Sequence, residues 1–198
     1  MTRLLLVRHG QSEWNAQGRW QGQADPPLSD TGREEARLAA ATLKRFDGLF
    51  FASTLLRARQ TAEIVSEEVG GRSVMLEPDM REIDVGDFSG LDNDEIQARF
   101  PEAWAALRAG ELQTFPGGED RAHFLERVLA ALRGITSRHP DDEVFVATHG
   151  GAIGAVERHL EVHPGVGVRN LESRWFVIDR DGFRVESGRI DLLNRQSS

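Results

Sequence analysis

Residues 4–15 read LLLVRHGQSEWN. The four apolar residues at its start, Leu4–Val7, form the kind of continuous run found in strands that are buried on both faces of a sheet. The run ends abruptly in Arg8, His9 and Gly10, and further polar residues follow. A buried strand with this ending would place basic, hydrogen-bonding groups at the edge of a sheet, but the pattern also occurs at ordinary strand-to-loop junctions. The rest of the chain has to decide between these two interpretations.

The same ending occurs a second time. Residues 144–147 (VFVA) predict another buried strand, and His149, Gly150 and Gly151 follow it closely. In open α/β sheets ligands bind beyond the carboxyl ends of the strands, so the two histidines are expected to meet at one edge. Glycines allow the backbone to approach a ligand closely. A helix is expected to begin at Gly151, and the positive end of a helix suits an anion.

Strand and helix patterns alternate along most of the chain. Apolar runs predict further strands at 49–52 and 74–76, and a hairpin of residues 175–179 and 183–187 around Asp181-Gly182. Helical spacing and capping residues predict helices at 33–46, 55–69, 120–138 and 151–160. This alternation predicts an α/β fold, a three-layer α/β/α sandwich with a mainly parallel central sheet.

Residues from about 77 to 118 interrupt the alternation. Two short helical stretches, 93–100 and 101–109, lie between loops that contain Gly86, Gly90 and Gly117. We interpret this segment as a small helical and loop excursion, a candidate lid, within a single domain that spans residues 1–198.

Composition narrows the class of protein. The 198 residues carry a net charge of −8, which disfavours nucleic acid and anionic membranes as partners. The chain has no cysteine, so disulfides, thiol nucleophiles and thiolate metal sites are excluded. The apolar stretch at the N-terminus is too short for a signal peptide and no run reaches transmembrane length, so we expect a cytoplasmic protein. An apolar helix face is compatible with a homodimer.

Three further charged residues are candidates for the same site. Arg57 follows the strand at 49–52 and begins a helix, which would place a bidentate oxyanion donor at the same sheet edge. Glu82 and Asp84 are carboxylates in a glycine-containing loop, where such residues are common without any special role.

Two other ligand classes fit less well. His159 and His163 stand four apart as zinc ligands on a helix do, but Pro164 follows and no third ligand is evident. The segment VFVATHGGAIG carries His149 where a dinucleotide-binding fingerprint needs its first glycine.

Five motifs, taken together, resemble the histidine phosphatase superfamily, the phosphoglycerate-mutase-like group. They are RHG with Asn15, LLRARQTAE at 55–63, REIDVGDFSG at 81–90, FPGGED at 115–120 and THGG at 148–151. The resemblance extends from residue 2 to about residue 190. RHG alone would be weak, whereas the ordered set is specific.

The resemblance implies a phosphohistidine mechanism without metal or cofactor. His9 would attack phosphorus, with its other ring nitrogen bound by a backbone carbonyl. Arg8, Arg57 and a cationic His149 would bind the phosphate, and Glu82 would protonate the leaving group. Asn15 and the N–H of Gly150 would be further phosphate donors, and Asp84 is the alternative acid.

Within this family the sequence favours a metal-independent phosphatase that acts on a small phosphorylated metabolite. The segment from Gly90 to Gly117 is short and contains only Arg99 and Arg108 as cations, whereas a mutase must clamp a sugar acid. The alternatives are a cofactor-dependent phosphoglycerate mutase and a non-catalytic anion-binding module. Gln21 is the best candidate for substrate specificity. Other residues that could line the leaving-group side, or simply pack, are Trp20, Phe88, Trp104, Arg108 and Phe115.

Overall fold

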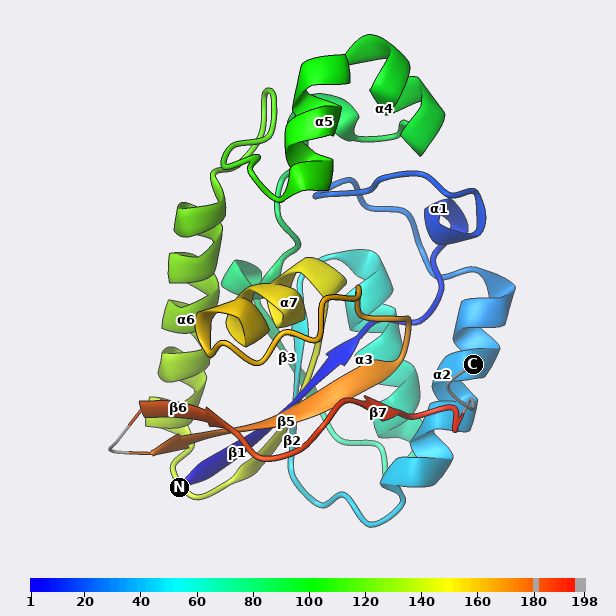
Figure 1. Ribbon diagram of the computed structural model, residues 1–198. Coiled ribbons are helices and arrows are strands. Elements are labelled where there is room, and N and C mark those ends of the chain that lie inside the picture. Colours follow the sequence, from blue (N-terminus) through cyan, green and yellow to red (C-terminus); the bar gives the residue numbers. More distant parts are fainter. Residues whose placement is uncertain (180–181, 195–198) are drawn as a thin grey trace.

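The structure is a computed structural model that describes residues 1–179 and 182–194. Its core is a seven-stranded sheet in the order β3-β2-β4-β1-β5-β6, with β7 paired to β5 (Figure 1). The strands are β1 (Thr2–Arg8), β2 (Leu49–Ser53), β3 (Val74–Glu77), β4 (Glu143–Thr148), β5 (Glu172–Asp179), β6 (Gly182–Val185) and β7 (Ile190–Asp191). The α-helices are α1 (Glu13–Ala16), α2 (Asp30–Ala40), α3 (Leu56–Glu68), α4 (Asn93–Arg99), α5 (Pro101–Ala109), α6 (Arg121–Arg138) and α7 (Gly150–His159). Short 3-10 turns are η1 (Ala41–Leu43), η2 (Pro78–Met80) and η3 (Gly86–Phe88).

The sheet is mixed. Strands β1 to β4 pair with one another in parallel fashion, whereas β5 is antiparallel to β1, β6 and β7. The predicted α/β class and sandwich are therefore confirmed, with the parallel part formed by the four strands that alternate with helices.

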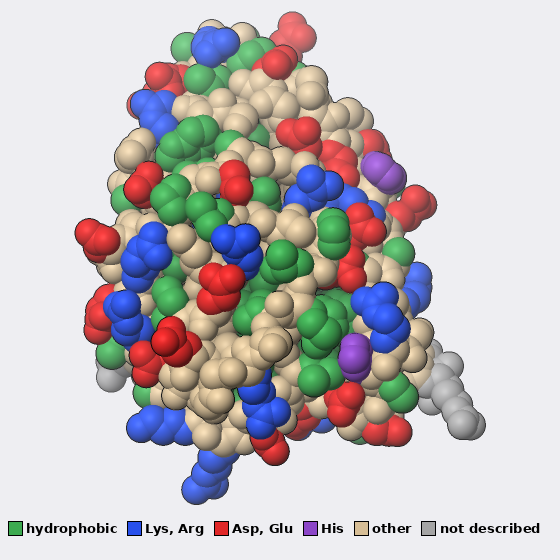
Figure 2. Space-filling model, turned by 180° about the vertical axis from the view of Figure 1, so that it is seen from behind, with side chains coloured by type: hydrophobic (Ala, Val, Ile, Leu, Met, Phe, Trp, Pro, Cys, Tyr) green, Lys and Arg blue, Asp and Glu red, His purple; other side chains and the backbone are tan. Residues whose placement is uncertain are grey.

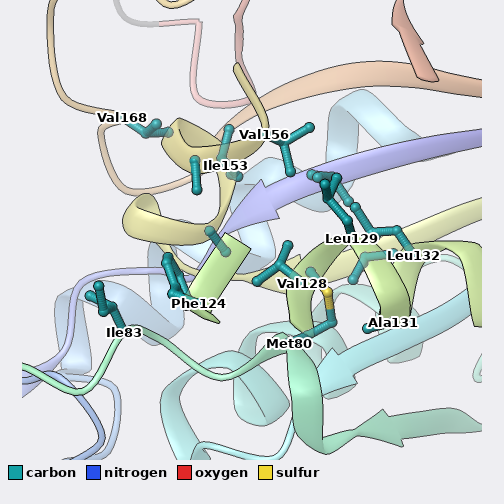
Figure 3. Packing of buried hydrophobic residues seen from close by; sticks show 14 of the residues in the cluster. Met80, Ile83, Phe124, Val128, Leu129, Ala131, Leu132, Ile153, Val156 and Val168 are labelled. Carbon is teal, nitrogen blue, oxygen red and sulfur yellow. The ribbon is translucent and has the colours of Figure 1, made fainter. Parts of the chain in front are cut away.

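Alternate residues of the central strands point into two separate cores. Leu4, Leu6 and Val146 pack on the side covered by α6 and α7, whereas Leu5 and Phe145 pack on the side covered by α2 and α3. Figure 3 shows apolar side chains of α6 and α7 converging with Met80 in the first of these cores. Because a strand alternates its side chains between two faces, a run that is apolar throughout has to be covered on both.

The pairing of β1 with β4 decides where the two His-Gly endings lie. Arg8 is in register with Thr148, and the N–H of His9 donates to the carbonyl of Thr148 at 3.0 Å. Strand β2 pairs with the other edge of β4, so the residues that follow Ser53 lie at the same end of the sheet. Parallel pairing thus brings three distant segments together at one edge.

Residues 77–118 leave the sheet after β3 and return to it through α6. Figure 1 shows α4 and α5 at the top of the view, on the side toward which β1 points. Gly86, at φ 51°, lies against the 116–118 turn, because a Cβ there would be 2.1 Å from the carbonyl oxygen of Pro116. The excursion is therefore tied back on itself beside the strand ends.

Some predicted boundaries were wrong. Residues 10–27, whose polar, glycine- and proline-containing sequence predicts a long loop, contain α1, whose N-cap Ser12 and N3 residue Asn15 form a reciprocal capping box. The helix predicted over 33–46 begins at Asp30, because Ser29 caps it, and continues as η1. The turn residue Asp181 lies outside the described residues.

The charged surface is mixed in sign on the face seen from behind. Figure 2 shows Lys and Arg side chains interspersed with Asp and Glu over this face, so neither sign dominates it. In the described part of the chain, no helix is both long and apolar enough to span a bilayer.

Candidate active site

His9 follows the last residue of β1 and is 3% exposed. Its Nδ1 lies 2.7 Å from the carbonyl oxygen of Gly10. A carbonyl oxygen only accepts, so Nδ1 carries the proton and Nε2 presents its lone pair. The expected contact between one ring nitrogen and a backbone carbonyl is therefore confirmed. The Gly10 N–H in turn donates to Thr61 Oγ1 at 3.0 Å, which fixes this turn against α3.

Arg57, in the first turn of α3, is the largest fully buried side chain and lies directly against His9. Its Nε donates to His9 Nε2 at 3.2 Å, and its two terminal nitrogens donate to the carbonyls of Ala24 and Gly22 at 2.7 and 2.8 Å. Burial lowers the pKa of Arg57 to about 10, so the group stays charged at neutral pH. Three of its five N–H donors are used, and two remain for a ligand.

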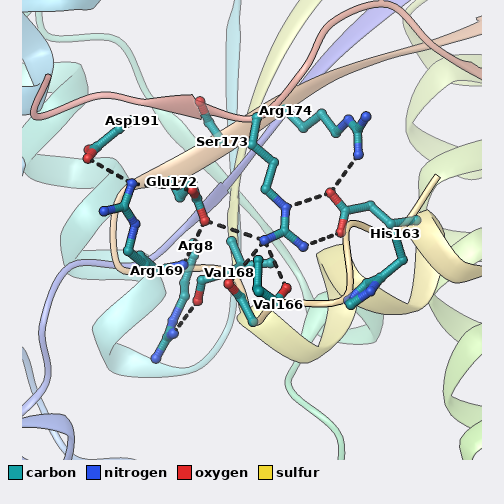
Figure 4. A network of polar contacts seen from close by, with 12 residues as sticks. Arg8, His163, Val166, Val168, Arg169, Glu172, Ser173, Arg174 and Asp191 are labelled. Atoms are coloured by element: carbon teal, nitrogen blue, oxygen red, sulfur yellow. Dashed lines mark hydrogen bonds and ion pairs between the residues drawn. The ribbon is translucent and has the colours of Figure 1, made fainter. Parts of the chain in front are cut away.

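Arg8 is the last residue of β1, and its side chain lies beside Gly150. Its Nη1 donates to the carbonyl of Val168, as Figure 4 shows, and its buried Nε has no hydrogen-bond partner. Burial lowers the pKa of Arg8, and the charges of Glu82 and Glu172 oppose that shift. A buried donor without a partner is unusual in proteins, and here it lies where an anion is expected.

The backbone around Val168, which accepts from Arg8, is held by Arg189, and Arg189 is itself held by an ion pair. Arg189 donates to the carbonyls of Val166 and Gly167, and its Nε bonds Glu157 at 2.9 Å. Glu157 is fully buried on α7 and also accepts from Arg174 at 2.9 Å. This network positions the backbone to which Arg8 binds.

Replacing Glu157 with Gln should lower the free energy of unfolding by about 3 kcal/mol, because two partly buried guanidiniums would lose the fully buried carboxylate that they share. Urea denaturation measures this loss. Glu126→Gln, which neutralises an exposed carboxylate on α6, is the control and should change stability by no more than about 0.5 kcal/mol. A loss for Glu157→Gln as small as that of the control would contradict the role of the network.

His149 caps the N-terminus of α7 and is fully buried beside His9, with 5.2 Å between the ring centroids. Its Nε2 lies 2.9 Å from Ser53 Oγ, and its Nδ1 is buried without a partner. Burial and the charge of Arg57 lower the pKa of His149 well below its ordinary value. These surroundings disfavour the cationic form expected of His149. A bound phosphate dianion would raise the pKa again.

The two histidines predict a specific dependence of stability on pH. Burial, followed by Arg57, lowers the pKa of His9 well below its ordinary value, as it does for His149. Below about pH 6.5 the unfolded chain therefore binds protons that the folded chain does not. Stability should fall as pH drops through this range, by up to about 1.4 kcal/mol per pH unit for each histidine.

Urea denaturation of the wild type and of His9→Gln/His149→Gln, at pH 7.5 and 5.5, tests this prediction. Other titrating groups are common to both proteins. The difference between the two proteins in how much the free energy of unfolding changes with pH therefore isolates the contribution of the two histidines. Equal changes would show that these imidazoles are not held neutral by the fold.

Glu82, in the loop after η2, directs its carboxylate toward the glycine that follows His149 and Gly150. The N–H of Gly151 donates to its Oε2 at 3.0 Å, and the N–H of Ile83 to its Oε1 at 2.9 Å. A Cβ on residue 151 would lie 2.1 Å from Glu82 Oε1. The second glycine of the THGG motif therefore makes room for this carboxylate.

Arg127 of α6 fixes the backbone that carries Glu82. Its terminal nitrogens donate to the carbonyls of Asp79, Arg81 and Glu82 at 2.7 to 2.9 Å, and it pairs with Glu119 at 2.7 Å. The motif FPGGED contains Glu119, but nothing in the sequence pattern connected it with Glu82.

Asn15 and Gln21 lie beside His9 with their amide oxygens already bonded. Asn15 Oδ1 accepts from the N–H of Ser12 and from Asn170 Nδ2, and Gln21 Oε1 accepts from Ser12 Oγ at 2.8 Å. Their amide nitrogens are thereby oriented as the donor ends. Asn170 also donates to the carbonyl of His9 at 2.9 Å.

Part of this constellation lines a cavity of about 920 Å³, whereas His149 lies behind it and is not a lining residue. The predicted site residues that line it are Arg8, His9, Asn15, Gln21, Arg57, Glu82 and Gly150. The segment 77–118 contributes the further lining residues Ile83, Val85, Leu107, Gln113 and Phe115. The excursion therefore forms one wall of the cavity.

Several candidates do not line the cavity. Phe88 is fully buried beneath Trp20, with 6.0 Å between the ring centroids, and Trp104 packs on Trp20 at 6.5 Å. Arg108 is exposed on α5, where Leu107 faces the cavity instead. Asp84 accepts from the N–H of Gly86 and stabilises the loop. Trp20 and Phe115 do line the cavity.

The sequence did not identify Ser53, Thr61, Arg127 and Asn170 as functional residues. Each of them hydrogen-bonds a candidate residue or the backbone next to one. Only Ser53, the last residue of β2, carried a usable signal, because it ends a strand at the same sheet edge. His159 and His163 gain no third ligand, since the residues that the structure describes contain no group of three suited to a metal ion.

The chain belongs to the Histidine phosphatase superfamily (branch 1), whose profile matches residues 4–190. This confirms the resemblance expected from the motifs. The chain is 40% identical over 180 residues to the 2,3-bisphosphoglycerate-dependent phosphoglycerate mutase of Methylobacterium radiotolerans, covering 86% of this chain and 84% of that one. It is 31% identical over 191 residues to the metal-independent phosphoserine phosphatase of Arabidopsis thaliana, covering 90% and 80%.

A solved structure shares the fold. The mycobacterial glucosyl-3-phosphoglycerate phosphatase, in complex with VO3, superimposes with a TM-score of 0.80 and 29% identity over 93% of this chain and 96% of that one. The chain is therefore similar both to phosphatases and to a mutase.

Proposed function

We propose that this protein hydrolyses phosphomonoesters of small metabolites through a phosphohistidine on His9. The observation that carries this proposal is the contact of His9 Nδ1 with the Gly10 carbonyl, which leaves Nε2 unprotonated at the cavity, where Arg57 Nε donates to it. Because burial and Arg57 lower the pKa of His9, the ring is neutral, and therefore nucleophilic, at pH 7.

In the first step, the His9 Nε2 lone pair bonds to phosphorus while the bond from phosphorus to the ester oxygen breaks. Arg57 Nε, now 3.2 Å from Nε2, has to exchange this contact for a phosphoryl oxygen. Negative charge on the three equatorial oxygens is stabilised by donors already in place, the free N–H groups of Arg8 and Arg57 among them. The neutral His149 ring carries its proton on Nδ1 if Ser53 donates to Nε2, which makes Nδ1 a further donor.

Glu82 supplies the proton that the leaving alkoxide needs, and Asn15 Nδ2 and the N–H of Gly150 add contacts to the phosphoryl group. The resulting carboxylate then takes a proton from water, whose oxygen attacks phosphorus. The bond from phosphorus to nitrogen breaks, and its electron pair returns to His9 Nε2. Gln21 contributes to specificity through its amide nitrogen.

The alternative activity, phosphoglycerate mutase, is favoured by the relative that is 40% identical. A mutase has to hold its sugar acid over the phosphohistidine while water stays out. All of residues 77–118 are described, and no Lys or Arg among them lines the cavity. This observation supports the hydrolase.

The test is to incubate the purified protein with a panel of phosphomonoesters, including 3-phosphoglycerate, and to follow free phosphate and isomer composition together. Phosphate release that His9→Ala abolishes is the expected result. Exchange between phosphoglycerate isomers with little release would make the protein a mutase. Binding of phosphate without either reaction would leave only an anion-binding module.

A further inference from the structure

The cavity contains two arginines that the proposed mechanism does not use. Arg121, the first residue of α6, and Arg158, near the end of α7, both line it. Within residues 1–179 and 182–194, neither side chain makes an ion pair or a side-chain hydrogen bond. Arg19, which also lines the cavity, is by contrast paired with Glu95 at 3.1 Å.

Arg121 has the same feature as Arg8. Its Nε is buried and has no hydrogen-bond partner, while its guanidinium lies 5.5 Å from the centroid of the Phe115 ring. Leaving a buried donor unpaired costs about 1–3 kcal/mol, a cost that an acceptor bound in the cavity would remove. The ring of Phe115 limits where the guanidinium can lie.

Arg158 reaches back along its own helix toward the phosphate pocket. Its Nη1 lies 3.2 Å from the position that a Cβ on Gly154 would occupy, so the absence of a side chain at 154 makes room for it. Gly154 is four residues after Gly150, which corresponds to about 6 Å along the helix axis. The guanidinium is thus within the span of one small molecule bound at His9.

The charges of Glu157 and Glu82 raise the pKa of Arg158 and so oppose its lowering, but both carboxylates are bonded to other groups. Glu157 is engaged by Arg174 and Arg189, and Glu82 accepts from the N–H groups of Ile83 and Gly151. Burial, followed by the charge of Arg121, lowers the pKa of Arg158, which indicates two guanidiniums in mutual repulsion. An oxyanion placed between them would relieve that repulsion.

We propose that Arg121 and Arg158 form a second anion subsite, which binds a carboxylate or a second phosphate on the leaving part of the substrate. The proposal rests on the proposed function, since it places the phosphoryl group at His9. It defines the substrate class as small phosphomonoesters that carry another oxyanion a few atoms away, and it assigns α6 and α7 a part in specificity.

Binding by His9→Ala separates this proposal from catalysis. Calorimetry compares 3-phosphoglycerate with glycerol 3-phosphate, which has a hydroxymethyl group in place of the carboxylate. A second pair, propane-1,3-diol bisphosphate and its monophosphate, tests a phosphate as the second oxyanion. We expect the doubly anionic member of at least one pair to bind about 10–100-fold more tightly, the effect of one or two charge-assisted contacts.

That preference should disappear in His9→Ala/Arg121→Gln/Arg158→Gln and persist in His9→Ala/Arg108→Gln, whose altered arginine is exposed outside the cavity. The two single arginine variants keep the test decisive if the triple variant fails to fold, because each should lose part of the preference. No preference in either pair, or a preference that survives loss of both arginines, overturns the proposal. Failure of the proposed function would give a different result: the doubly anionic ligands would still be preferred, but the wild type would release no phosphate.

Discussion

The His9→Ala protein should release phosphate at least about 10⁴-fold more slowly than the wild type on any substrate that the wild type hydrolyses. The substitution removes the one lone pair that the Gly10 carbonyl and Arg57 orient toward the cavity. Arg8 and Arg57 remain, so the variant should still bind phosphate. Loss of turnover with retained anion binding is what removal of a nucleophile predicts.

Phosphate release in the steady state and calorimetric titration with inorganic phosphate measure the two quantities. His123→Ala, at an exposed histidine of α6, is the matched control and should retain full activity. In the wild type, quenching during turnover should yield a protein whose mass exceeds the unmodified chain by one phosphoryl group, with the modification on His9. Turnover by His9→Ala within tenfold of the wild type would rule out the phosphohistidine.

The second large effect should come from one methyl group. Gly151→Ala should lower kcat by about 100-fold or more, because a Cβ there would lie 2.1 Å from Glu82 Oε1 and would displace the carboxylate. A positioned acid or base contributes about 10²–10⁴-fold, so loss of its position should cost nearly as much as loss of its chemistry. Glu82→Gln is therefore expected to show a decrease of similar size.

The comparison of three variants distinguishes this explanation from general damage. If Gly151→Ala acts through Glu82, the double variant Gly151→Ala/Glu82→Gln should be no slower than the slower single variant. Gly134→Ala, on α6, is the control for the substitution itself, since its nearest neighbour is the flexible end of Arg138 at 3.5 Å. Multiplicative losses in the double variant would show that residue 151 affects activity by another route.

The sequence was sufficient for the predictions that depend on local pattern. Apolar runs at 4–7 and 144–147 predicted strands buried on both faces, and both pack into two cores. The expected meeting of His9 and His149 followed from parallel pairing, since the carboxyl ends of adjacent parallel strands share one edge. Arg57 could be placed from the same argument, because it begins the helix after β2.

The wall of the cavity that residues 77–118 form was predicted less well. Phe88, Trp104 and Arg108 were candidates by residue type, but helix rotation and the aromatic cluster direct them away from the cavity. The excursion that carries them has no neighbouring strand to fix its register. Side-chain direction there depends on contacts with Trp20 and with the 116–118 turn, which a sequence pattern does not encode.

What the sequence determined alone is the family, the sheet edge and the ring that we propose as the nucleophile, because motifs and strand patterns are local properties of the chain. Tertiary structure decided the charge states and the partners. The lowered pKa of His149 comes from burial beside Arg57, and the position of Glu82 depends on Gly151 and Arg127. Arg121 and Arg158 share one cavity only because α6 and α7 pack on the same face. Such effects arise from distances between groups far apart in the chain, so they exist only once the chain has folded.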